Sequence, residues 1–164
     1  MKFAASTVHT LHDTALGPLI LAATEEQLVG IWFAGQRHQP DTSHWARDEQ
    51  HALLRRVKTE LDEYFAGQRH TFALPLDMAC GTVFQQTVWR ALLTIPYGSS
   101  TSYGALSSAV GRPSAVRALG AAVGRNPFSI VVPCHRVIGA KGALTGYAGG
   151  LERKAALLKA EGVL

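Results

Sequence analysis

The sequence predicts an α+β fold in two parts: a small N-terminal antiparallel β-sheet with a helix over residues 1–76, and a mostly helical part over residues 77–164. Three observations predict this division. Short apolar or alternating runs with turn signals between them fill the first third of the chain, which is typical of strands. Apolar residues then recur at helical spacing. Several short helical patterns, separated by glycine and proline, follow residue 77.

The N-terminal part begins with three expected strands, at residues 7–12, 19–23 and 28–33. Turn signals at Gly17-Pro18 and Thr24-Glu25-Glu26 connect them into an antiparallel hairpin or meander. From about Thr42 the pattern becomes helical, and Gly67 is expected to stop the helix. The apolar residues at three- and four-residue steps are Leu54, Val57, Leu61, Tyr64 and Phe65.

One hexapeptide, Phe-Ala-Gly-Gln-Arg-His, occurs at residues 33–38 and again at residues 65–70. The residues around the two copies do not repeat. We therefore interpret the pair as a coincidence and not as a structural repeat.

The C-terminal part follows a linker around residues 74–80. Thr82 is expected to cap its first helix, which Pro96-Tyr97-Gly98 ends. The apolar stripe of that helix is Phe84, Val88, Trp89, Leu92 and Leu93. Later, Ile130-Val131-Val132 has the pattern of a short buried strand.

A helix-turn-helix is the main candidate for a binding element. Thr101 or Ser102 opens a helix over residues 103–110, Gly111-Arg112-Pro113 breaks it, and Ser114 is expected to cap a second helix that runs to about Gly124. The second helix carries mostly alanine and glycine, and Arg117 is its one large polar side chain before Arg125. Two interpretations stay open: close packing against another helix, or a smooth helix placed against DNA with Arg117 projecting.

Charge divides the chain unevenly. Residues 1–97 hold eight Lys/Arg and ten Asp/Glu, whereas residues 98–164 hold eight Lys/Arg and two Asp/Glu. No carboxylate occurs between Asp77 and Glu152. This stretch is either a face that meets a polyanion or mostly core with a few solvated arginines. Its basic residues are Arg90, Arg112, Arg117, Arg125, Arg136 and Lys141.

Other function classes find little support. No apolar run approaches the roughly 20 residues of a membrane span, and no signal-peptide core follows Met1, so we expect a cytoplasmic protein without membrane contact. The two cysteines, Cys80 and Cys134, form neither a disulfide framework nor a C-x-x-C motif. Cys80 is expected to be a buried or linker thiol, and a metal site is not expected.

Cys134 lies in Pro133-Cys134-His135-Arg136, where its neighbours argue against an inert core thiol. Pro133 stiffens the backbone before the cysteine. Positive charge nearby would lower the thiol pKa, and a histidine can take the thiol proton if a third group orients it. Only Glu152 and Glu161 are carboxylates in the basic half, so one of them is the expected orienting group. The residues alone predict an activated cysteine of unspecified reaction.

With these residues in view, the chain closely resembles the O6-alkylguanine-DNA alkyltransferases, the methylated-DNA–protein-cysteine methyltransferases. The resemblance is strongest over residues 81–162, and the N-terminal meander and helix also look like that family's less uniform first domain. The matching motifs are Gly81-Thr82-x-Phe84-Gln85-x-x-Val88-Trp89, Ile95-Pro96-Tyr97-Gly98, Ser102-Tyr103-Gly104, Arg117-Ala118-Leu119-Gly120, Arg125-Asn126-Pro127, Pro133-Cys134-His135-Arg136-Val137 and Gly146-Tyr147-Ala148-Gly149-Gly150.

The resemblance implies a ribonuclease H-like support domain over residues 1–76 and a winged-helix-like domain over residues 77–164 that binds DNA and accepts the alkyl group. It implies single-turnover, direct-reversal repair of O6-alkylguanine, and possible action on O4-alkylthymine, in double-stranded DNA. The helix-turn-helix would dock in the minor groove, and the damaged base would be flipped out. The chain would act as a monomer of the stand-alone form, with no cofactor and no metal.

The resemblance also implies residue roles. Cys134 would accept the alkyl group, His135 would be its base through a water, Glu161 would orient His135, and Tyr103 would crowd the rotating phosphate and hydrogen-bond the leaving guanine. Arg117 would fill the vacated stack. Asn126 would tie the recognition helix to the cysteine turn, and Arg136 would brace that turn. The other DNA-binding candidates are Ser102, Ser114, Ala118, Arg125 and Asn126, and those for the base pocket are Val132, Tyr147, Ala148 and Gly149.

Three other classes remain to be separated from this one. Alkyltransferase-like binding modules share the scaffold but carry tryptophan at the cysteine position, and Cys134 argues against them. The second class is a sequence-reading regulator, which would need more base-reading side chains than this small-residue helix offers. The third is a Cys-His-Glu hydrolase, which would not need a basic, carboxylate-free half.

Overall fold

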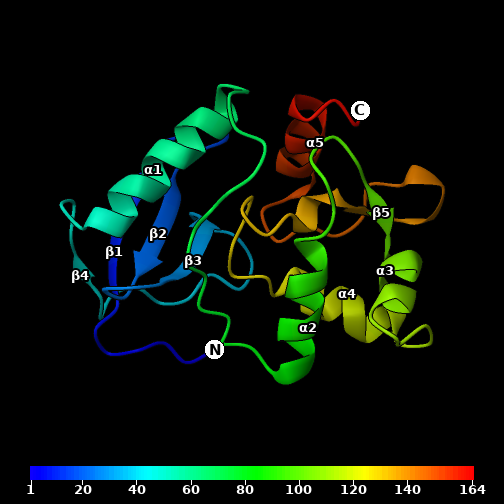
Figure 1. Ribbon diagram of the computed structural model, residues 1–164, viewed down its shortest axis with the longest axis horizontal. Helices are drawn as coiled ribbons and strands as arrows, with labels where there is room; N and C mark the ends of the chain where they lie inside the picture. Colours follow the sequence, from blue (N-terminus) through cyan, green and yellow to red (C-terminus); the bar gives the residue numbers. More distant parts are fainter.

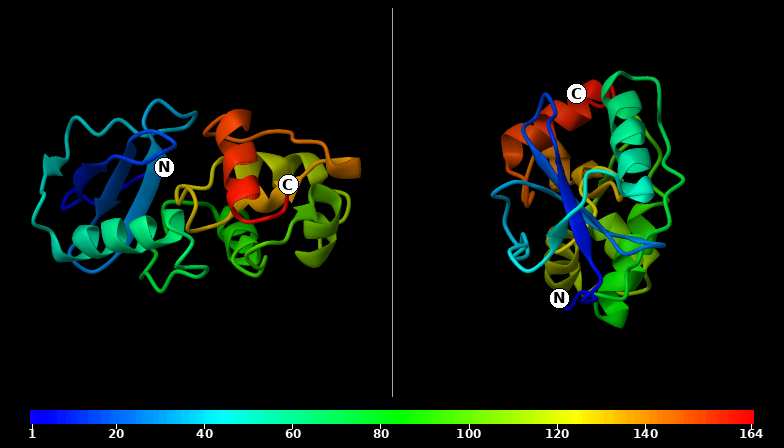
Figure 2. Two further views of the ribbon diagram at one scale, coloured as in Figure 1. Left: turned by 90° about the horizontal axis from the view of Figure 1, so that it is seen from above. Right: turned by 90° about the vertical axis from the view of Figure 1, so that its left-hand side faces the viewer.

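The computed structural model describes residues 1–164. A sheet with one helix forms one half, and the remaining helices form the other (Figure 1). Seen from above, the two halves lie side by side, with the N-terminus near their boundary and the C-terminus within the helical half (Figure 2). The α+β fold class expected from the sequence is confirmed. No helix is both long and apolar enough to span a bilayer.

The N-terminal sheet contains the three expected strands: β1 (Val8–His12), β2 (Leu19–Ala23) and β3 (Leu28–Phe33). Both neighbouring pairs are antiparallel, which confirms the meander. A fourth strand, β4 (Ala46–Arg47), was not predicted; it pairs in parallel with β1 and completes the order β3-β2-β1-β4. A two-residue strand has no periodicity to detect, because its pairing alone defines it.

Helix α1 (Ala52–Phe65) covers one face of the sheet and begins ten residues later than Thr42, where the helical pattern was expected to start. His51 caps its first turn, and β4 occupies part of the preceding segment. Trp45 is not part of the helix, because it packs with Phe3 and Trp32 against the other face of the sheet. Gly67 ends the helix with a positive φ of 71°, as expected.

Helix α2 (Val83–Leu92) opens the C-terminal half with a capping box between Thr82 and Gln85. Trp89 is fully buried, and its indole donates to the carbonyl of Ala122 at 2.9 Å, which joins α2 to the second helix of the helix-turn-helix. Leu93 does not belong to the buried stripe, because it lies beyond the helix end and is 46% exposed.

The helix-turn-helix consists of α3 (Tyr103–Ala109) and α4 (Val116–Gly124). Ser102 caps α3 by accepting a hydrogen bond from the amide of Ala105. The expected cap by Ser114 is wrong: Ala115 occupies that position, and no side chain caps α4. The short strand β5 (Thr101–Ser102) pairs in parallel with β6 (Val137–Ile138), a pairing not predicted.

The segment Ile130-Val131-Val132 is buried but is not a strand. Ile130 has a φ of 73°, and the amides of Val131, Val132 and Cys134 donate to nearby carbonyls as in tight turns. A continuous apolar run indicates burial but does not distinguish a strand from a buried turn.

After this turn come the 3-10 helices η1 (Cys134–Arg136) and η2 (Ala140–Gly142) and the final helix α5 (Leu151–Ala160). The halves share one core, and β3 extends across the boundary, because the amide of Ile31 donates to Pro127 and that of Ser129 to Ile31. The sheet is therefore fastened directly to the residues that follow α4.

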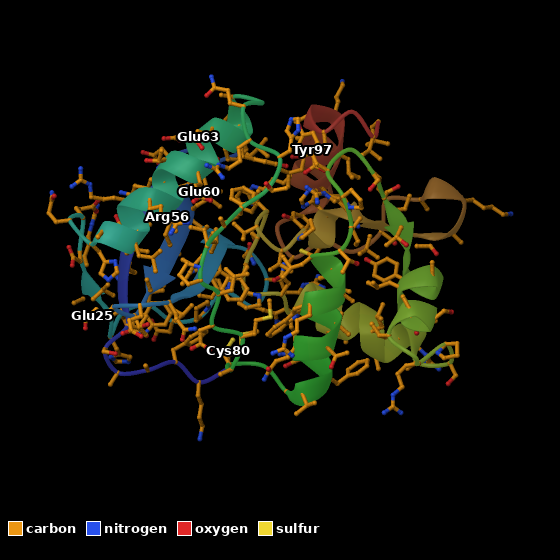
Figure 3. All side chains as sticks on the ribbon, viewed as in Figure 1. Glu25, Arg56, Glu60, Glu63, Cys80 and Tyr97 are labelled. Carbon is orange, nitrogen blue, oxygen red and sulfur yellow. The ribbon has the colours of Figure 1, made fainter.

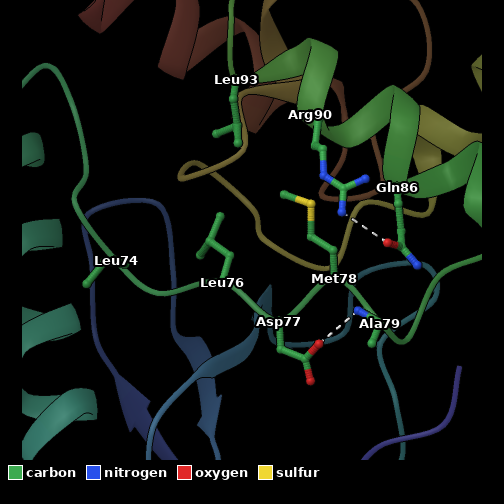
Figure 4. Close-up of a pocket in the computed structure, with 8 residues that line it drawn as sticks. All are labelled: Leu74, Leu76, Asp77, Met78, Ala79, Gln86, Arg90 and Leu93. Atoms are coloured by element: carbon green, nitrogen blue, oxygen red, sulfur yellow. Dashed lines mark hydrogen bonds between the residues drawn. The ribbon is translucent and has the colours of Figure 1, made fainter.

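The linker between the halves carries the half-buried Cys80 (Figure 3). It also forms, with α2, an open pocket of about 500 Å³ (Figure 4). No residue proposed for catalysis lines this pocket, whose walls are Leu74, Leu76, Asp77, Met78, Ala79, Gln86, Arg90 and Leu93.

Candidate active site

Cys134 begins η1 directly after the buried turn and is 7% exposed. Pro133 precedes the cysteine, and the backbone amide of Cys134 donates to the carbonyl of Val132 at 2.8 Å. The thiol is therefore held at a fixed place by a compact turn.

Asn126 connects α4 to that turn. Its amide nitrogen donates to the carbonyl of Val132 at 2.8 Å and to the Sγ of Cys134 at 3.1 Å, while its Oδ1 accepts from the amide of Phe128. The side chain is buried, with 4% exposure, and its polar atoms face inward; contact of Asn126 with DNA stays a prediction. The geometry is that of a structural tie.

His135, Arg136 and Glu161 form a buried cluster beside the thiol-bearing turn. The Nε2 of His135 lies 2.8 Å from the Oε1 of Glu161, and Arg136 donates to both carboxylate oxygens at 2.8 and 3.0 Å. The hydroxyl of Tyr64, from α1, donates to the same carboxylate at 2.6 Å. The Nη1 of Arg136 also donates to the carbonyl of Ile95 at 2.6 Å, which braces the turn.

The protonation of this cluster follows from its contacts. Burial works against the charge of Glu161, but hydrogen bonds from His135, Arg136 and Tyr64 lower its pKa to about 2. Because an ionised carboxylate only accepts, the Nε2 of His135 must carry the proton. Burial lowers the pKa of His135, which favours the neutral ring with its lone pair on Nδ1. That Nδ1 is buried and has no partner among the protein atoms.

The thiol itself is not activated by Arg136, contrary to the sequence-based expectation. Burial raises the pKa of the Cys134 thiol, against lowering influences from the hydrogen bond of Asn126, the charge of Lys154 and the backbone amides of Cys134 and His135. The charge of Arg136 is neutralised by Glu161. Arg136 also does not belong to a basic surface, since it is buried. The resting thiol therefore needs a base to become a nucleophile.

Lys154 is a site residue that the sequence analysis missed. It lies on α5 and is fully buried, where its ammonium donates to the carbonyls of Val137, Thr145 and Gly146 at 2.5, 2.9 and 3.1 Å. Burial lowers its pKa to about 8, against the raising influence of Cys134. Helical spacing was the available signal, because Lys154 precedes the buried Leu157 and Leu158 by three and four residues.

An opening of about 230 Å³ lies near this cluster, between α4, Tyr103 and the loop that contains Tyr147 and Ala148. The hydroxyl of Tyr103 donates to the carbonyls of Thr145 and Gly146. Burial, and then the proximity of Cys134, raises the pKa of Tyr103. Cys134 itself does not line the opening, but its charge influences Tyr103, which does.

Two of the expected pocket residues lie behind this opening and do not line it. Val132 is fully buried in the core. Gly149 is buried where a Cβ would approach Tyr147 and Phe33 to 2.8 and 3.0 Å.

The expected DNA-binding residues other than Asn126 lie around the helix-turn-helix. Arg117 and Ala118 are exposed on α4, Ser114 is exposed just before it, and Arg125 is exposed just after it. Ser102 is half-buried at the start of α3, where its hydroxyl is engaged in the cap. None of these arginines forms an ion pair within the chain.

Each half of the chain matches a known protein family domain. Residues 7–78 match the family described as 6-O-methylguanine DNA methyltransferase, ribonuclease-like domain, and residues 83–163 match 6-O-methylguanine DNA methyltransferase, DNA binding domain. The chain belongs to the 6-O-methylguanine DNA methyltransferase family.

Its relatives include the methylated-DNA–protein-cysteine methyltransferase of Mycobacterium leprae, 49% identical over 149 residues that cover 91% of this chain and 88% of that one. The constitutive methylated-DNA–protein-cysteine methyltransferase of Bacillus subtilis is 48% identical over 157 residues, 93% of this chain and 94% of the relative. The crystal structure of Mycobacterium tuberculosis O6-methylguanine methyltransferase superposes with a TM-score of 0.87 at 46% identity, covering 95% and 93% of the two chains. A structure of the Mycobacterium tuberculosis protein in complex with DNA gives 0.86 at 46% identity, covering 94% and 92%.

Proposed function

We propose that this chain repairs DNA by transferring the alkyl group of O6-alkylguanine in a duplex to the Sγ of Cys134. The observation that carries the proposal is the position of the thiol: it sits beside a buried His135–Glu161 pair and is tied by Asn126 to a helix-turn-helix. The relatives named as methylated-DNA–protein-cysteine methyltransferases support the substrate class.

In the proposed reaction the thiol proton passes to the Nδ1 of His135 through a water molecule. The thiolate attacks the alkyl carbon, so the carbon–sulfur bond forms as the carbon–oxygen bond breaks with its electron pair going to guanine O6. The guanine anion that leaves then takes up a proton, which balances the proton lost by the thiol and restores guanine. Tyr103 would donate a hydrogen bond to the leaving guanine, which stabilises its developing charge. Because no group is placed to cleave a thioether, each molecule reacts once.

The proposed DNA contacts begin at α4. Its small residues would let the helix lie close to the minor groove, and Arg117 would enter the stack that the flipped nucleotide leaves. Ser102, Ser114, Ala118 and Arg125 would contact the backbone around it, giving sequence-independent affinity. Tyr147 and Ala148 would enclose the extruded base, with the buried Gly149 packed against Tyr147.

This proposal includes the assignment of residues 1–76 as a support domain and 77–164 as the reactive domain. We further propose a monomer in the cytoplasm, where a reducing environment keeps Cys80 and Cys134 as thiols.

The test is to incubate the protein with a duplex that contains one O6-methylguanine and to weigh the intact protein. We expect a gain of one CH2, located on the Cys134 peptide, with guanine restored and product limited to one equivalent. Binding without an adduct would instead indicate an alkyltransferase-like module, and repeated turnover would contradict transfer to the protein.

Two variants sharpen the test. Cys134→Ala should abolish transfer and keep DNA affinity, whereas Arg117→Ala should slow transfer from duplex DNA because base flipping is impaired. An unchanged repair rate in Arg117→Ala would show that this side chain does not fill the stack.

A further inference from the structure

The two copies of the repeated hexapeptide have different electrostatic surroundings. In the second copy Arg69 pairs with Glu63 at 2.7 Å and with Glu60 at 3.4 Å, and His70 stacks on Tyr97 at 4.0 Å between ring centroids. Glu60, Glu63 and Tyr97 are visible around that copy in Figure 3.

In the first copy, Arg37 and His38 are exposed, and neither side chain forms a hydrogen bond or an ion pair. The same two residue types therefore have side-chain partners at one site and none at the other.

The loop that carries Arg37 is held in place from both sides. The Oε1 of Gln36 accepts from the amide of Phe33 at 2.8 Å and from the hydroxyl of Ser129 at 3.1 Å. The amide of Arg37 itself donates to the carbonyl of Ala148 at 3.1 Å. Ser129 and Ala148 belong to the reactive half, one just after α4 and one in the loop over the site. The N-terminal loop is thus docked against the reactive half, and its residues Arg37 and His38 line the opening together with Ala148.

Charge in this opening has one sign. Arg37 and His38 line it together with Arg125 from the end of α4, and no carboxylate is among the lining residues. Burial, followed by the charges of Arg125 and Arg37, lowers the pKa of His38, so His38 offers a neutral hydrogen-bond donor while the two arginines, which repel each other, supply the positive charge. An anion placed among them would relieve that repulsion and would gain hydrogen bonds from a guanidinium that has no partner in the chain.

We propose that Arg37 and His38 extend the DNA-binding surface onto the N-terminal domain and, with Arg125, bind a phosphodiester of the lesion-bearing strand next to the flipped nucleotide. This inference rests on the proposed function. The support domain then does more than hold the cysteine turn, because its β3–β4 loop contacts the substrate. Phosphate is the matching ligand, since the opening lies beside the helix that is proposed to enter the minor groove.

The first experiment measures binding of a duplex with one O6-methylguanine as a function of salt, in a Cys134→Ala background that prevents reaction. Arg37→Ala should weaken binding about fivefold, and the slope of log K against log salt should be shallower by about 0.9, as expected for the loss of one phosphate contact. Arg37→Lys should keep most of the slope. Arg55→Ala is the matched control, because Arg55 is an exposed arginine on α1, away from α4 (Figure 1).

The second experiment locates the phosphate. Single neutral methylphosphonates are placed along the lesion-bearing strand, and each is tested with and without Arg37. At one position beside the lesion, the loss of binding free energy from the methylphosphonate and the loss from Arg37→Ala should not add. Both changes remove the same contact between a phosphate and Arg37.

Arg37→Ala binding like Arg55→Ala, or additive losses at every position, would overturn the inference. Its failure is separate from that of the proposed function, which is read from the mass of the wild-type protein. Wild type that transfers the alkyl group while Arg37→Ala and Arg55→Ala bind alike would refute only the role of Arg37. Wild type that does not transfer, with an Arg37 effect still present, would refute only the proposed reaction.

Discussion

The Nε2 of His135 and the Oε1 of Glu161 lie 2.8 Å apart, and both side chains are fully buried. The carboxylate is shared with Arg136 and Tyr64, so it is saturated with donors and stays ionised. This arrangement fixes the tautomer of His135 and directs its basic nitrogen away from Glu161. The proposed proton transfer therefore depends on a residue that does not touch the thiol.

Glu161→Gln should slow alkyl transfer by about 10²-fold or more, because the amide can no longer fix the tautomer or stabilise a protonated His135. It should also lower the free energy of unfolding by roughly 3–5 kcal/mol, since Arg136 loses its buried partner. Single-turnover transfer is measured at a temperature where circular dichroism shows the variant folded. Tyr64→Phe is the control: it removes a neutral donor, which is worth about 1 kcal/mol, and should change the rate little. A Glu161→Gln rate close to that of Tyr64→Phe would contradict the role of Glu161.

The transfer rate should depend on pH through His135 and not through the thiol. Burial lowers the pKa of His135 below 6.5, so the basic form persists at neutral pH and is lost only as the pH falls through that lowered value. The rate should therefore be flat around pH 7 and fall on the acid side. Direct ionisation of the thiol predicts a different profile, since burial raises its pKa above 9.0 and the rate would climb into alkaline pH. Single-turnover rates from pH 5 to pH 9 distinguish the two.

Lys154→Met should lower the free energy of unfolding by roughly 2–3 kcal/mol, because three buried carbonyls lose a charged donor. Transfer should also slow by about tenfold, since a nearby cation no longer favours the thiolate. Chemical denaturation measures the first effect and single-turnover kinetics the second. Lys159→Met, on the exposed side of the same helix, should stay within about 0.5 kcal/mol of wild type. Equal midpoints for the two variants would refute the anchoring role of Lys154.

Gly149→Ala should lower the free energy of unfolding by about 1–3 kcal/mol, because its Cβ would come within 2.8 Å of Tyr147 and 3.0 Å of Phe33. The displaced tyrosine should also impair transfer. Gly124→Ala is the matched control, since a Cβ there meets nothing within 4 Å and alanine favours the helix by about 0.5–1 kcal/mol. Thermal unfolding of both variants tests the pair, and a Gly149→Ala protein as stable as Gly124→Ala would contradict the packing argument.

The sequence by itself determined the features that depend on local patterns: the three strands of the meander, the Thr82 cap, the helix-turn-helix and Cys134 with its basic neighbours. Alternation, capping chemistry and helical spacing act over a few residues, so they can be read from the chain directly. The family resemblance added Glu161 as the partner of His135, and the structure brings those two residues together.

Only the tertiary structure decided which charges are buried and which are free. Arg136 is neutralised by Glu161, Lys154 donates to three carbonyls, and Arg37 is left without a side-chain partner in the opening beside α4. In the sequence all three residues look alike, because each is a basic residue with no adjacent carboxylate. Ile130–Val132 became a turn for a similar reason, since burial alone does not select a strand. These outcomes depend on partners distant in the sequence, and no local periodicity records the desolvation or the contacts that those partners impose.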